Sequence, residues 1–87
     1  DELEEVLTNR DSVEEAYEAR ELRSAINGFL DTLNASDRFI FMRRYWYSDP
    51  VKDIAIMADS TTNSVTVRLF RIREKLRRYL VKEGLLV

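Results

Sequence analysis

Residues 48–83 read SDPVKDIAIMADSTTNSVTVRLFRIREKLRRYLVKE, and this stretch decides the expected fold. Asp49 is a favourable N-cap, and Pro50 suits the first helical position, where a missing N–H costs no hydrogen bond. The apolar residues that follow recur at helical spacing, as Val51, Ile54, Ala55 and Ala58. Ser60 and Thr61 can each cap a second, much longer helix. The stretch therefore predicts a short helix, a tight turn and a long helix, which is the order of a helix-turn-helix.

The long helix carries two kinds of residue on different sides. Its apolar residues are spaced by four, three, four and four positions, at Val65, Leu69, Ile72, Leu76 and Leu80. Its cations are Arg68, Arg71, Arg73, Lys75, Arg77, Arg78 and Lys82. Only Glu74 and Glu83 oppose them in charge. We therefore expect one face to pack against the rest of the domain and the remaining circumference to be cationic.

Two further helices are expected before this stretch. Ser12 and Glu15 fit a capping box, and apolar positions continue from there to about Asn34. Gly28 weakens this helix by about 1 kcal/mol relative to alanine, so we expect it to permit a close contact between helices. Ser36 is the expected cap of the next helix. Together with the C-terminal pair, these elements predict an all-α domain of four helices.

The helix after Ser36 is apolar nearly all round, so it is either central or shows one face to a partner. The residues expected in its core face are Phe39, Ile40 and Met42. Those that fit the core and an interface about equally are Phe41, Trp46 and Tyr47. Arg43 and Arg44 fit ion pairs and phosphate contacts equally well.

Composition narrows the classes of function. A chain of 87 residues makes one domain, and a hydrophobic content of 45% with regular periodicity argues against disorder. The absence of Cys and His removes disulfides, thiolate metal sites and the commonest general base, so we expect neither an enzyme nor a cofactor. No apolar run approaches the ~20 residues of a membrane span, and no signal peptide is visible.

Charge is divided unevenly along the chain. Residues 1–21 hold nine acidic and two basic residues, a net charge of −7, whereas residues 22–87 hold twelve basic and seven acidic residues, a net charge of +5. Binding of phosphates depends on a local patch, so the overall charge of −2 does not exclude nucleic acid. Residues 1–11 are expected to be an acidic, flexible linker and residues 12–87 the domain. The alternative is that the acidic residues screen the basic helix from DNA.

Several short motifs resemble one known family. They are Phe29-Leu30 with Leu33, Asp37-Arg38, Arg43-Arg44-Tyr45-Trp46, Asp53-Ile54-Ala55 and, within residues 65–80, Arg71-Ile72-Arg73-Glu74-Lys75-Leu76. Together they resemble region 4 of bacterial sigma factors of the extracytoplasmic-function type, over roughly Leu22 to Gly84. The resemblance implies a cytoplasmic bacterial protein that recognises the upstream (−35) promoter element and directs transcription initiation by RNA polymerase.

The predicted turn departs from that family. Where relatives usually have Gly, this chain has Asp59, which tolerates a positive φ less well than glycine but better than most residues. Ser60 replaces a usually apolar residue and Ile56 a usually polar one, so we expect either a looser turn or an exposed apolar spot. Gly84 is the expected C-cap of the long helix, and the apolar tail after it is expected to fold back onto the core.

Helical geometry with Val65, Leu69 and Ile72 buried places the other side of the long helix toward a DNA groove. The predicted base-reading residues, with which the family resemblance agrees, are Thr66, Val67, Phe70 and Arg71. The predicted contacts to the DNA backbone are Lys52, Thr62, Asn63, Arg68, Arg73 and Arg77. The resemblance implies docking on the flap of the RNA polymerase β subunit and binding by an anti-sigma factor. The predicted partner surface is Ile26, Phe29, Leu30 and Phe41.

Two other classes of protein remain open. An output domain of the LuxR kind also has Ile-Ala before the turn, but it binds DNA as a dimer and lacks the Arg-x-Arg-Glu-Lys-Leu run. An interaction module could retain the helix-turn-helix and bind only protein, and the altered turn is compatible with it. A test of binding to duplex DNA separates this protein-only module from the sigma-like hypothesis, which requires such binding.

Overall fold

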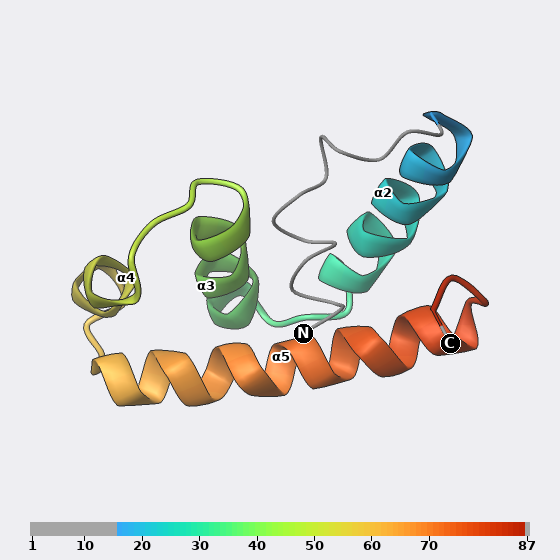
Figure 1. The fold of residues 1–87 in the computed structure, drawn as a ribbon. Coiled ribbons are helices and arrows are strands. Elements are labelled where there is room, and N and C mark those ends of the chain that lie inside the picture. The colour runs from blue at the N-terminus through green and yellow to red at the C-terminus, as the bar shows by residue number, and fades with distance from the viewer. Residues whose placement is uncertain (1–15, 87) are drawn as a thin grey trace.

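The computed structural model describes residues 16–86, and within them every regular element is an α-helix (Figure 1). The helices are α2 (Ala16–Leu30), α3 (Ala35–Tyr45), α4 (Val51–Met57) and α5 (Thr62–Lys82). This confirms the predicted all-α class. The expected helix start at Ser12 and the boundary between residues 11 and 12 lie outside the described residues. No helix in the described range is both long and apolar enough to cross a membrane.

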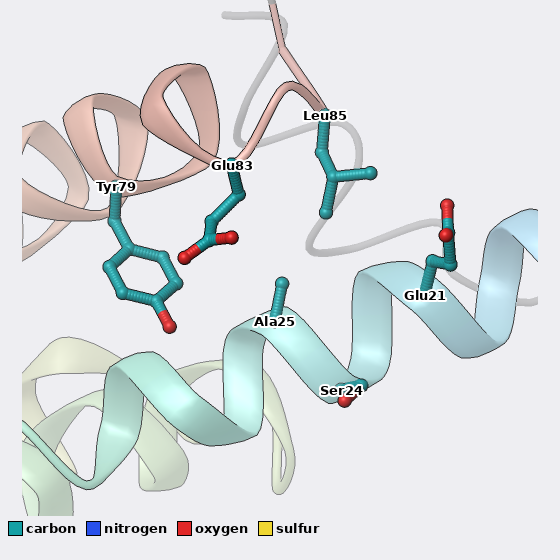
Figure 2. Close-up of a pocket in the computed structure, with 6 residues that line it drawn as sticks. All are labelled: Glu21, Ser24, Ala25, Tyr79, Glu83 and Leu85. Atoms are coloured by element: carbon teal, nitrogen blue, oxygen red, sulfur yellow. The ribbon is translucent and has the colours of Figure 1, made fainter.

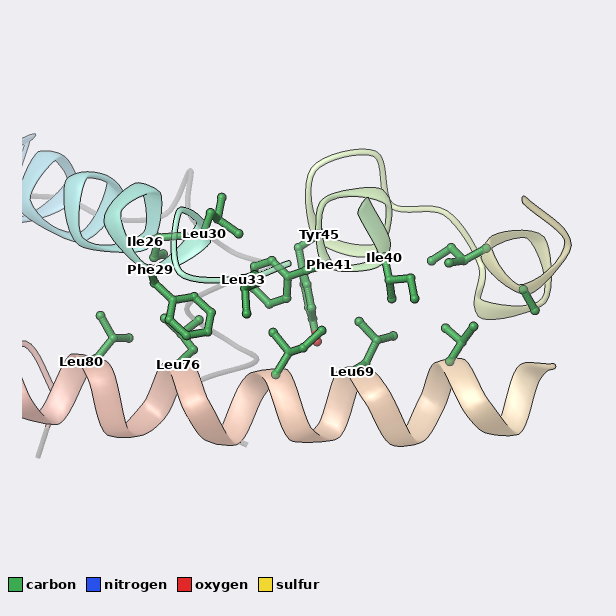
Figure 3. Packing of buried hydrophobic residues seen from close by; sticks show 14 residues of the cluster. Ile26, Phe29, Leu30, Leu33, Ile40, Phe41, Tyr45, Leu69, Leu76 and Leu80 are labelled. Carbon is green, nitrogen blue, oxygen red and sulfur yellow. The ribbon is translucent and has the colours of Figure 1, made fainter. Parts of the chain in front are cut away.

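The longest helix, α5, is the base on which the other three helices rest (Figure 1). The apolar stripe predicted for it is buried, at Val65, Leu69, Ile72, Leu76 and Leu80. The core is correspondingly drawn out along α5 (Figure 3). The end of α2 packs over Leu76 and Leu80, whereas Ile40 of α3 lies above Leu69 (Figure 3). Burial of this one stripe therefore fixes which side of α5 faces solvent.

The predicted partner surface is wrong, because its four residues belong to the core. They are Ile26, Phe29, Leu30 and Phe41. Phe29 is 3% exposed and Phe41 is fully buried, and their rings meet edge to face with centroids 6.4 Å apart. These rings pack in one cluster with side chains of α5, so the four residues are not available to a partner.

The outward side of α3 also differs from the prediction. Ile40 is fully buried as expected, but Phe39 is 42% exposed and belongs to no core cluster. Met42 and Trp46 are half-buried against the core, and Tyr47 is exposed. The helix is apolar on both sides, and the side that α5 covers is the one that carries Ile40 and Phe41.

Helix α2 ends at Leu30, four residues before the expected end. Its last carbonyls find partners in side chains, because the Thr32 hydroxyl donates to the Phe29 carbonyl at 2.6 Å and the Arg38 Nε donates to the Leu30 carbonyl at 3.1 Å. A second Arg38 nitrogen donates to the Leu33 carbonyl at 3.1 Å. Arg38 of α3 thereby holds the end of α2 in place.

Two of the predicted N-caps are different residues in the structure. Helix α3 is capped by Asn34 instead of Ser36, and its Oδ1 accepts from the Asp37 N–H at 2.8 Å. At the start of α4, Pro50 occupies the cap position and no side chain caps the helix. Asp49 instead forms an ion pair with Arg43 at 2.6 Å. Its backbone carbonyl accepts from an Arg44 nitrogen at 3.1 Å, so both arginines bind protein groups.

Both glycines have the roles predicted for them, a close helix contact at Gly28 and a helix C-cap at Gly84. A Cβ at Gly28 would lie 2.9 Å from the Tyr79 hydroxyl oxygen, so the glycine permits the close approach of α2 and α5. Gly84 has φ 78° and its N–H donates to the Val81 carbonyl, while the Leu85 N–H donates to the Leu80 carbonyl. This is the Schellman arrangement of a helix C-terminus. The tail turns back, and Leu85 packs against the core.

Candidate nucleic-acid interface

The turn between α4 and α5 is built on a residue in the left-handed region. Asp59 has φ 51°, and its N–H donates to the Ile56 carbonyl at 3.2 Å while the Ser60 N–H donates to the Ala55 carbonyl at 2.8 Å. These two hydrogen bonds again form a Schellman motif. The left-handed conformation that favours glycine is therefore adopted here by an aspartate. Ile56 is 78% exposed, which is the apolar spot expected from its unusual position.

Thr61 starts α5, since its Oγ1 accepts from the Ser64 N–H at 3.1 Å. The short helix α4 is held against α5 by Ile54, which is fully buried, and by Ala55. Helix α4 is seen end-on where α5 runs lengthwise (Figure 1), so the two helices cross. The N-terminal turns of α5 thus project beside α4, with solvent on their outer side.

The four predicted base-reading residues all lie on that outer side. They are Thr66, Val67, Phe70 and Arg71, and each is exposed. Phe70 is 56% exposed and Val67 38%, although both are apolar. The Thr66 hydroxyl donates to the Thr62 carbonyl at 2.8 Å, so it offers an outside group its oxygen lone pair and its methyl. We name Thr66, Val67, Phe70 and Arg71 the reading face.

Arg68 does not belong with the predicted backbone contacts. Its Nε and Nη2 donate to Asp37 Oδ1 at 3.1 and 2.6 Å, and Nη2 also donates to Ser36 Oγ at 2.7 Å. A guanidinium committed to the first turn of α3 positions α5 on the fold. The prediction that Arg68 contacts a DNA phosphate is therefore corrected: it binds Asp37 and Ser36.

The remaining predicted backbone contacts fall into two groups. Lys52, Thr62 and Asn63 are exposed around the start of α4 and α5 and are available to an outside partner. Arg73 is half-buried and donates to the Tyr45 hydroxyl at 3.0 Å. Arg77 is half-buried and also interacts within the protein. The structure therefore places the first group beside the reading face and holds the second group toward the core.

Three exposed cations were missing from the predicted site. Lys75, Arg78 and Lys82 continue the side of α5 on which Arg71 lies, at spacings of four, three and four residues. We name Lys75, Arg78 and Lys82 the distal cations. Their spacing can be seen in the sequence, but their exposure depends on which side of α5 is buried.

A cavity of about 320 Å³ lies between α2 and the end of α5 (Figure 2). It is lined by Glu21, Ser24, Ala25, Tyr79, Glu83 and Leu85. Glu83 points into it from α5 (Figure 2), and Glu21 lies across from it on α2. Two carboxylates repel phosphate, so this cavity is not part of the candidate interface. Within residues 16–86, no group of acidic side chains could bind a metal ion.

No protein-family model, curated protein or solved structure matches the chain. The family resemblance therefore stands on the motifs themselves, chiefly the run from Arg71 to Leu76. The class of protein that the structure defines is a small all-α domain in which a short helix, a turn and a long basic helix follow one another.

Proposed function

We propose that the chain is a sequence-selective DNA-binding domain of the sigma region 4 kind. In that role it recognises an upstream (−35) promoter element and directs transcription initiation by RNA polymerase. The single observation that carries the proposal is the reading face, since two apolar side chains and an unpaired guanidinium are exposed together on the N-terminal half of α5. The motifs that resemble sigma region 4 support the promoter as the target.

The chemistry of the reading face matches base edges in the major groove. The Arg71 guanidinium can donate two hydrogen bonds to the O6 and N7 of a guanine. Val67 and Phe70 present apolar surface that suits the C5-methyl groups of thymine. The preferred element therefore combines guanine with thymine, and the order of these residues along α5 sets the order of the bases.

The groups around the reading face suit the DNA backbone. Lys52 and Asn63 lie to either side of the turn, and the free N–H groups at the start of α5 point outward with no acidic residue in the first turn. Glu74 follows Phe70 by one helical turn and is the first carboxylate on this side of α5. We place the end of the base contacts before it.

Docking on RNA polymerase is the second half of the proposed function, and the family resemblance supports it. The surface used cannot be the four buried residues between α2 and α3. Phe39 and Arg43 of α3 and Tyr47, which follows the helix, are spaced four residues apart and form a ridge; both aromatic residues are exposed and Arg43 is half-buried. Aromatic residues and arginine are common at protein interfaces. Arg43 lies 4.3 Å from the centroid of the Tyr47 ring, which holds the two side chains together.

The same ridge favours the second candidate function, a module that binds only protein. Selection from a pool of random DNA duplexes separates the two. The proposed function predicts enrichment of one short motif that contains guanine and thymine. The matched variant Phe70→Ala should still enrich the guanine but lose the thymine preference at one position. Absence of any enriched motif would contradict the proposal and favour the protein-only module.

A further inference from the structure

Glu74 is the only carboxylate within the long helix α5, which also carries seven cations. At 3.6 residues per turn, it lies about 160° around the helix axis from the middle of the buried stripe. It therefore belongs to the side of α5 that carries the reading face. Around the axis it falls between Phe70 and Arg71, about 40° from the first and 60° from the second.

The Glu74 carboxylate and the Arg71 guanidinium are both unpaired with respect to residues 16–86. Neither forms a hydrogen bond or an ion pair with another residue in that range. Arg71 is exposed and Glu74 is half-buried. Side chains three residues apart on a helix are neighbours, with their Cβ atoms about 5–6 Å apart. The two opposite charges can therefore meet by rotation of their side chains alone.

An exposed guanidinium close to DNA has two competing partners. Phosphates attract it on every sequence, whereas the O6 and N7 of a guanine accept from it only where a guanine is present. An arginine that binds a phosphate carries no information about sequence. A guanidinium has five N–H donors, of which a guanine engages two. The donors that remain leave room for a carboxylate at the same time.

We propose that Glu74 is a positioning residue that directs Arg71 to guanine instead of phosphate, and thereby sets the sequence selectivity of the reading face. The proposal rests on the proposed DNA binding. On a site with guanine, Glu74 accepts from the N–H groups that the base leaves free and so orients the guanidinium in the groove. On other sequences it retains the guanidinium and repels the phosphates, which weakens binding. Glu74 itself contacts no base in this arrangement.

Helix stabilisation is the competing role for Glu74, because Arg78 follows it by four residues in the favourable order of charges. That role changes only how well α5 is formed, so it affects the binding of every DNA sequence alike. The ratio of the affinities for two different duplexes therefore separates the two roles.

The test titrates the selected duplex and a scrambled duplex with the wild type, Glu74→Gln, Arg71→Ala and the double variant. Glu74→Gln should tighten binding to the scrambled duplex about threefold and weaken binding to the selected one about twofold, so selectivity falls about sixfold. In the Arg71→Ala background the same substitution should change selectivity by less than about twofold. The control Glu83→Gln removes the same charge at the C-cap of α5 and should leave selectivity unchanged.

Two results would overturn the proposal. Equal changes on both duplexes for Glu74→Gln would show a general effect of charge or helix stability. An equal loss of selectivity with and without the Arg71 side chain would show that Glu74 does not act through Arg71. A wild type that binds both duplexes equally would be a failure of the proposed function itself, and Glu74 would then have no selectivity to set.

Discussion

At the scale of single residues, the turn depends on one aspartate. Asp59 adopts a φ of 51°, a region that costs an ordinary L-residue roughly 1–2 kcal/mol and that Asp enters more easily than most. Two hydrogen bonds to the end of α4 hold it there. The position of the reading face relative to α4 follows from this conformation, because α5 begins three residues later.

Replacing Asp59 by glycine should stabilise the domain. We expect the free energy of unfolding to rise by about 0.5–1 kcal/mol in the Asp59→Gly variant, because glycine reaches positive φ without steric cost. The Asp59→Ala variant is the matched control and should be destabilised. Urea denaturation followed by circular dichroism measures both. A lower stability of Asp59→Gly than of the wild type would contradict this account of the turn.

At the scale of the elements, α5 was predictable and α3 was not. The five apolar residues of α5 define one narrow stripe, so its buried side follows from spacing alone. Helix α3 carries apolar residues on more than one side, and burial of Phe41 with exposure of Phe39 depends on where α5 lies. Spacing along one helix contains no such information.

The predictions for the N-caps and for Arg68 were wrong for a related reason. Asn34 and Ser36 are both good N-caps, and Asp49 could cap α4 or pair with Arg43, so local preference leaves the choice open. Arg68 is one of seven cations on α5, and only its neighbour across the fold, Asp37, separates it from the solvent-facing ones. The reading face itself was predictable because it is the complement of the buried stripe.

The contact of α2 with α5 provides a test at this scale. Gly28→Ala should gain helix stability but bring its Cβ to 2.9 Å from the Tyr79 hydroxyl oxygen, so we expect little net change in the free energy of unfolding. In a Tyr79→Phe background the obstacle is gone, and the same substitution should stabilise the domain by about 0.5–1 kcal/mol. Thermal and urea unfolding of the four proteins measure the coupling. Equal effects of Gly28→Ala in both backgrounds would show that the hydroxyl does not set the approach of the helices.

At the scale of the whole molecule, charge and shape divide the surface of α5 into functional regions. One stripe is buried, Arg68 and Arg73 join α3, and the side left to solvent carries the reading face and then the distal cations. Residues 22–87 carry a net charge of +5, which suits an anionic partner. Promoter DNA is the partner we propose for this basic side of α5.

The central claim is that Arg71 reads a base and is more than a source of charge. Labelled duplexes carrying the selected sequence and a scrambled sequence are titrated with the wild type, with Arg71→Ala and with the control Lys52→Ala, at two salt concentrations. Arg71→Ala should lose about 1–3 kcal/mol of binding free energy on the selected duplex and much less on the scrambled one. Lys52→Ala should weaken binding to both duplexes alike and lower the salt slope by about one. Equal losses on the two duplexes for Arg71→Ala would contradict the base-reading role.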